Sequence, residues 1–135
     1  MSPRPISGAF GFTTTFRDEG PDVTGLAYLL PNEERFLFYL EFTRKAPDTT
    51  RSQVVEFITR ANYDLAIGNF EFDYESGAIR FKSSVDFQGN ELPASLVRNV
   101  ILAAMDAVET YSETLVEVME GKILPKPAID KLESF

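Results

Sequence analysis

Short segments in which apolar and polar residues alternate recur along the chain, a pattern typical of β-strands. Three such segments come first, separated by turn-forming residues, and span Ile6–Phe16, Val23–Leu30 and Arg35–Thr43. Two more, Phe70–Tyr74 and Ile79–Phe87, flank a short turn at Gly77 and predict a hairpin. We therefore expect an antiparallel sheet of about five strands.

Helical spacing of apolar residues separates the third strand from the fourth, and a second helical pattern runs from Pro93 to about Glu120. Gly121 follows, and a left-handed glycine at such a position commonly ends a helix. The order β-β-β-α-β-β-α predicts an α+β fold with two helices packed on the sheet. We expect a single domain over residues 6–121, a loose N-terminus over residues 1–5 and a C-terminal tail over residues 122–135.

The third strand carries apolar residues on both faces, whereas an antiparallel sheet usually leaves one face polar. Leu37 and Tyr39 lie on the face opposite its phenylalanines, and Ala27 and Leu29 of the second strand are expected to join them in one outer patch. The patch has two interpretations: a helix or terminus of the same chain covers it, or it binds a second copy or another protein.

The polar face of the long helix carries a row of carboxylates at spacings of three and four, which we call the acidic strip: Asp106, Glu109, Glu113, Glu117 and Glu120. Its simplest interpretation is a solvated face, and its functional interpretation is a docking site for a basic segment of a protein partner. At 1.5 Å per residue the helix would be about 42 Å long, more than the diameter of roughly 36 Å expected for the domain. We therefore expect a homodimer, formed through the outer patch or the helix.

Composition removes several function classes. The 135 residues include neither cysteine nor histidine, so thiolate chemistry, a Ser-His-Asp triad and the commonest metal ligands are excluded. The net charge of −8 disfavours nucleic acid and anionic membranes as partners. Nucleotide-binding and nucleophile-elbow motifs are missing. We expect a cytoplasmic, non-enzymatic protein with no catalytic residue, metal or cofactor.

One stretch of the chain also resembles a known family. Asn62 ends the first helix, Gly68, Phe70 and Phe72 follow, and Gly77, Ile79, Arg80 and Phe81 form the second half of the hairpin. With the long helix that comes after it, this stretch resembles the YbjN family, described as bacterial sensory transduction regulators. The resemblance implies a fold like that of type III secretion chaperones, which are small acidic dimers that hold partner polypeptides.

The residues and the resemblance together favour a protein-binding module, regulatory or chaperone-like, that acts as a homodimer on an unidentified protein partner. The alternative is a small-ligand-binding protein or enzyme with a pocket between the sheet and the helices.

Overall fold

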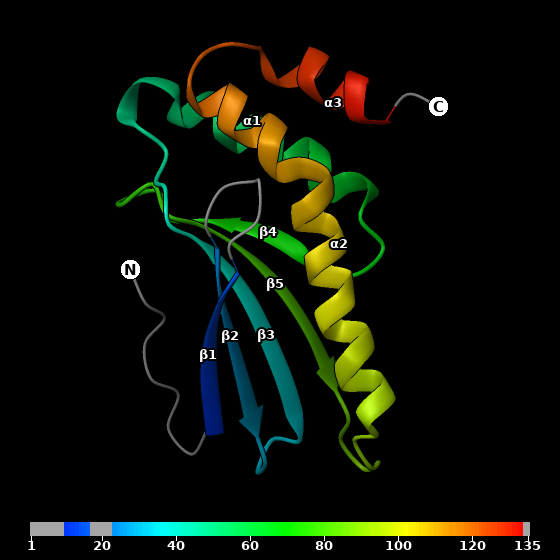
Figure 1. Ribbon diagram of the computed structural model, residues 1–135. Coiled ribbons are helices and arrows are strands. Elements are labelled where there is room, and N and C mark those ends of the chain that lie inside the picture. The colour runs from blue at the N-terminus through cyan, green and yellow to red at the C-terminus, as the bar shows by residue number, and fades with distance from the viewer. Residues whose placement is uncertain (1–9, 17–22, 134–135) are drawn as a thin grey trace.

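The computed structural model describes residues 10–16, by their backbone alone, and residues 23–133. An antiparallel five-stranded sheet with the order β1-β2-β3-β5-β4 forms its centre (Figure 1). The strands are β1 (Phe10–Phe16), β2 (Val23–Leu30), β3 (Arg35–Phe42), β4 (Asn69–Phe72) and β5 (Ile79–Asp86). The α+β class and the antiparallel sheet are confirmed. The predicted loose residues 1–5 lie outside the described part of the chain.

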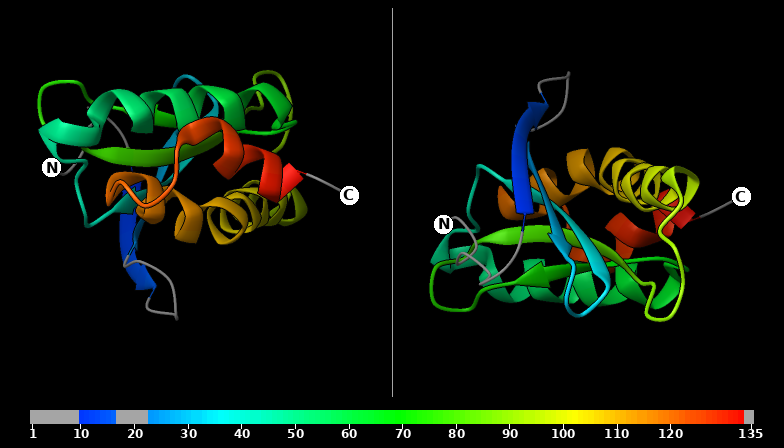
Figure 2. Two further views of the ribbon diagram at one scale, coloured as in Figure 1. Left: turned by 90° about the horizontal axis from the view of Figure 1, so that it is seen from above. Right: turned by 90° about the horizontal axis from the view of Figure 1, so that it is seen from below.

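Three helices pack with this sheet. After a short 3-10 turn, Asp48–Thr50, helix α1 (Arg51–Asp64) lies beside the edge strand β4, and α2 (Ala94–Met119) runs along β3 and β5. The third helix, α3 (Pro125–Glu133), packs against α1 and α2 (Figure 2). The core therefore lies between α2 and one face of the sheet, with α1 and α3 closing one end.

The alternation of side chains between the two faces of β3 and β5 shows which face of the sheet lies against the core. Phe36, Phe38, Leu40 and Phe42 are all buried on one face of β3, and Phe81 lies directly opposite Leu40 on β5. Phe81 also meets Phe70 of β4 edge-on, with ring centroids 4.9 Å apart. These residues share one apolar cluster with α2, so we call this the helix-facing side of the sheet and the other its outer face.

Helix α2 ends as its sequence predicts. Gly121 has φ of 73°, its N–H donates to the carbonyl of Val118 at 3.0 Å, and the N–H of Lys122 donates to the carbonyl of Glu117 at 2.9 Å. This pair of hydrogen bonds is the Schellman arrangement, which only a left-handed residue allows at low cost.

The prediction of two helices and a C-terminal tail was wrong, because residues 125–133 form α3. Ala128 and Ile129 of this helix are buried in the main apolar cluster. Pro125 and Pro127 would break a helix in its interior. Both lie in the first turn of α3, where the missing N–H of proline breaks no intrahelical hydrogen bond.

Candidate partner-binding surfaces

The outer patch predicted from Ala27, Leu29, Leu37 and Tyr39 does not form as a single surface. The β2–β3 pairing places Ala27 opposite Phe38 and Leu29 opposite Phe36, which puts them on the helix-facing side. Leu37 and Tyr39 lie on the outer face, where their partners in β2 are Tyr28 and Leu26. Side chains alternate between the two faces along each strand, as predicted. The register of β2 against β3, however, puts Tyr28 and Leu26 beside Leu37 and Tyr39 in place of Ala27 and Leu29.

The outer face around Tyr39 is aromatic and charged. Tyr39 is buried, and its ring meets that of Tyr28 edge-on with centroids 6.0 Å apart. The Arg80 guanidinium lies over the Tyr39 ring, 4.3 Å from its centroid, and donates from Nε to Glu71 at 2.6 Å. Lys82 is a second partner of Glu71, at 3.2 Å. Since Tyr39 is already enclosed by these contacts, its substitution would disturb the fold before it reported on an interface.

Charged side chains pair across the two strands of the hairpin. Glu71 pairs with Arg80 and Lys82 across β4 and β5. Asp73 lies beyond the end of β4. There it accepts hydrogen bonds from the Ser76 hydroxyl at 2.8 Å and the Glu75 N–H at 3.0 Å. The charged side chains of this hairpin therefore stabilise the hairpin itself.

The acidic strip is arranged along α2 in two halves. Four of its members are exposed, and Glu117 is half-buried. Glu117 pairs with Lys131 of α3 at 3.3 Å and Glu120 with Lys122 at 3.6 Å. Asp106, Glu109 and Glu113 form no ion pair with any residue of the described chain. The N-terminal part of the strip thus presents uncompensated negative charge to solvent.

Two apolar residues beside that charge were missed by the sequence argument. Leu102 and Met105 are 41% and 37% exposed, although they are large and hydrophobic. Their spacing from Asp106 and Glu109 places all four side chains on one side of the helix, by the three- and four-residue spacing of an α-helix. The signal was available: both residues fall outside the apolar stripe that faces the sheet. We call Leu102, Met105, Asp106, Glu109 and Glu113 the α2 surface.

Two further findings concern residues 10–16 and 23–133. No group of three or more Asp, Glu, His or Cys side chains in this part of the chain comes together as metal ligands would. None of its helices is long and apolar enough to cross a membrane.

Residues 13–117 match the sequence profile of a family described as "YbjN: Putative bacterial sensory transduction regulator". The chain belongs to the YbjN family. No curated protein matches it. The match runs from within β1 to near the end of α2 and stops before α3.

Two solved structures share the fold of this YbjN protein. One is a chain of the crystal structure of the ExsC–ExsE complex, with 17% identity and a TM-score of 0.55 over 78% of this chain and 75% of that chain. The other is a chain of the heterodimeric ExoU–SpcU complex from the type III secretion system of Pseudomonas aeruginosa, with 16% identity and a TM-score of 0.50 over 88% of each chain. At these identities the similarity establishes the fold alone.

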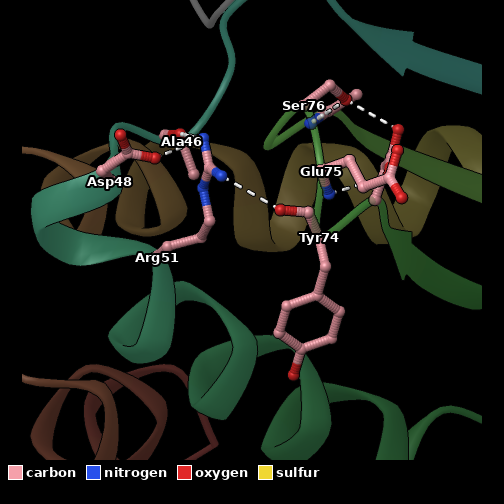
Figure 3. Close-up of polar contacts among 8 residues, drawn as sticks. Ala46, Asp48, Arg51, Tyr74, Glu75 and Ser76 are labelled. Carbon is pink, nitrogen blue, oxygen red and sulfur yellow. Dashed lines mark hydrogen bonds and ion pairs between the residues drawn. The ribbon is translucent and has the colours of Figure 1, made fainter.

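The hairpin on which the YbjN resemblance rests is held against the loop before α1 (Figure 3). The Arg51 guanidinium donates to the carbonyls of Tyr74 at 3.0 Å and Ala46 at 3.2 Å, and pairs with Asp48 at 3.0 Å. The Ala46 N–H in turn donates to the carbonyl of Gly77 at 2.9 Å. Gly77 has φ of 78°, and a Cβ there would overlap the Ala46 carbonyl. Glycine is therefore required by both conformation and space.

Hydrogen bonds within the turn of this hairpin also stabilise it. Hydrogen bonds from the Ser76 hydroxyl, and from the Glu75 N–H, lower the pKa of Asp73 below its ordinary value of 3.8. The carboxylate form is the one these donors stabilise, so Asp73 remains charged and bound at neutral pH.

Asn62 closes the free edge of β4. Its side-chain amide donates to the carbonyl of Phe70 at 3.1 Å, and its Oδ1 accepts from the Phe70 N–H at 2.8 Å. The side chain thus replaces a neighbouring strand at the edge of the sheet. An edge strand whose backbone groups are paired in this way cannot use them to recruit another chain.

Proposed function

We propose that this YbjN-family protein is a non-enzymatic protein-binding module with a regulatory or chaperone-like role, acting as a homodimer in the cytoplasm. The observation that carries this proposal is the α2 surface, where exposed apolar side chains adjoin carboxylates that form no ion pair within the described part of the chain. The fold adds support, since both similar structures are complexes of two different proteins.

The chemistry of the α2 surface favours a partner that is basic and amphipathic. Leu102 and Met105 offer apolar area that a partner would remove from water. Asp106, Glu109 and Glu113 would attract lysine or arginine around that contact, which speeds encounter and selects against acidic competitors. The net charge of −8 extends this attraction over the whole molecule. Affinity capture from the native cell, with charge-reversed α2 as the comparison, tests this function.

The same charges make the α2 surface a poor site for self-association. A two-fold interface brings a patch against its own copy, so acidic residues would meet acidic residues. Two exposed apolar residues at the end of α1 are better suited, because neither is charged: Tyr63 is 90% exposed and Ile67 is 55% exposed. We assign the homodimer contact to these two residues.

We expect the purified full chain to sediment as a dimer throughout the micromolar range. Replacing Tyr63→Ser together with Ile67→Ser should weaken the dimer at least about tenfold, equivalent to roughly 1.4 kcal/mol, because both side chains lose apolar contact area. Sedimentation velocity at several concentrations measures this. Leu124→Ser is the control, since Leu124 is also apolar and exposed but lies in the link to α3. A wild-type chain that sediments as a monomer would overturn the homodimer, and equal weakening by Leu124→Ser would overturn the assigned contact.

A further inference from the structure

Helix α3 lies outside the family match and packs on two other helices. The family match ends at residue 117, eight residues before α3 begins at Pro125. An exposed link that includes Leu124 connects it to α2. Three of its residues are buried: Pro125, Ala128 and Ile129. It contacts α1 and α2 but no strand of the described chain extensively, and its Ala128 and Ile129 join the main apolar cluster.

The charged side chains between α3 and the helices α1 and α2 are only partly paired with opposite charges. Lys131 pairs with Glu117 of α2 at 3.3 Å, a favourable contact with the acidic strip. Glu133, by contrast, lies beside Asp64 of α1 and Asp130 of its own helix. One donor does reach it: the Tyr111 hydroxyl of α2 donates to Glu133 Oε1 at 3.1 Å. Burial, with Glu133 as neighbour, raises the pKa of Tyr111 to about 12, so this hydroxyl remains a donor.

Glu133 therefore fits its position better when protonated. Burial first, and then a hydrogen bond to Asp64, raise the pKa of Glu133 above its ordinary value of 4.5. A raised carboxyl pKa means that the docked state binds the proton more tightly than the free helix does. Docking is then strongest below about pH 4.5 and weakens as the pH rises through the raised value. At neutral pH the carboxylates around Glu133 weaken docking, while the Lys131–Glu117 pair and the buried Ala128 and Ile129 favour it.

We propose that α3 is a displaceable strap over the surface that α1 and α2 present to it, here called the α1–α2 site, and that this site accepts an amphipathic helix from a protein partner with a basic residue where α3 carries Glu133. A cation at that position would pair with Asp64, where α3 itself places a carboxylate. The partner helix would resemble α3 in two respects. It would carry apolar residues at the spacing of Pro125, Ala128 and Ile129, and a basic residue opposite Glu117. The binding of a partner helix rests on the proposed function, whereas the displacement of α3 does not.

Thiol labelling can measure the opening, since the chain contains no cysteine. Ala128 in α3 and Ala104 in α2 are both fully buried, so Ala128→Cys and Ala104→Cys form a matched pair. We expect Ala128→Cys to react at least about tenfold faster under native conditions, because local opening needs less free energy than global unfolding. Adding Glu133→Gln should slow the reaction at pH 7 and remove its dependence on pH, after correction for thiol ionisation. Hydrogen exchange of the unmodified chain provides the same comparison between the amides of α3 and α2 if a variant fails to fold.

A peptide added in trans tests the α1–α2 site. The probe is a synthetic peptide of residues 122–135 carrying Glu133→Lys, and the control peptide has the native Glu133. The Lys peptide should accelerate labelling of Ala128→Cys in the full chain several-fold more than the control peptide does, because it holds the strap open. Labelling of Ala128→Cys no faster than that of Ala104→Cys would overturn the strap. Fast labelling that neither peptide changes would overturn the α1–α2 site as a binding site, and would leave partner capture by the α2 surface unaffected.

Discussion

Replacing Gly77 by alanine is expected to lower the free energy of unfolding by about 3 kcal/mol or more. Gly77 has φ of 78°, a conformation that costs an alanine roughly 1–2 kcal/mol. The added Cβ would also overlap the Ala46 carbonyl and lie 2.9 Å from an Arg51 guanidinium nitrogen. The backbone must then shift, which breaks the contacts that hold the hairpin against the loop before α1.

The matched control for Gly77→Ala is Gly89→Ala. Gly89 has the same φ of 78°, but a Cβ there would meet nothing within 4 Å. This variant should therefore lose only the conformational part, about 1–2 kcal/mol. Urea denaturation followed by circular dichroism measures both changes. If Gly77→Ala is no more destabilising than Gly89→Ala, the close approach of Ala46 to Gly77 does not contribute to stability.

The second large effect is expected at the edge of the sheet. Asn62→Ala should destabilise the protein by about 1–3 kcal/mol, since it leaves the Phe70 N–H without its side-chain partner and leaves the Phe70 carbonyl with Asn69 Nδ2 as its only side-chain donor in the described chain. It should also increase aggregation at high concentration, because β4 then presents the unpaired Phe70 N–H at the edge of the sheet. Denaturant titration measures the first effect, and light scattering at rising concentration measures the second.

Asn99→Ala serves as the comparison for Asn62→Ala. Asn99 is an exposed residue of α2, so its replacement should change stability by no more than about 0.5 kcal/mol, through helix propensity alone. Both substitutions exchange asparagine for alanine within a helix, and they differ in the contact to β4. Equal effects at the two positions would show that the Asn62 side chain does not stabilise the edge.

The elements that follow from local pattern could be predicted. Alternation along β3 identified its buried face, and the apolar stripe of α2 together with Gly121 gave the position and end of that helix. In each case the signal lies within a few neighbouring residues, and the packing agrees with local preference.

Features that depend on how distant segments meet could not be predicted in the same way. The register of β2 against β3 decided that Ala27 and Leu29 face the helices, and no residue within either strand specifies it alone. Helix α3 was missed because its prolines are stops in mid-helix but acceptable in a first turn. The carboxylates of the acidic strip could be placed on one face, but the pairing of Glu117 with Lys131 follows only from the docking of α3.

Affinity capture with a charge-balanced control tests the central claim most directly. The wild-type chain, Glu109→Lys with Glu113→Lys, and Glu33→Lys with Glu91→Lys are used as baits in extract of the native cell. Both double variants change the net charge from −8 to −4, since each substitution adds two positive charges, and all four glutamates are exposed. Quantitative mass spectrometry then compares what the three baits retain.

We predict a protein that the wild-type chain and the Glu33/Glu91 variant capture alike, and that the Glu109/Glu113 variant captures at least about tenfold less. Its capture should also weaken as salt is raised, because exposed charges mediate the contact. Equal loss in both double variants would show that net charge alone is responsible. Undiminished capture by the Glu109/Glu113 variant would contradict the α2 surface as the binding site.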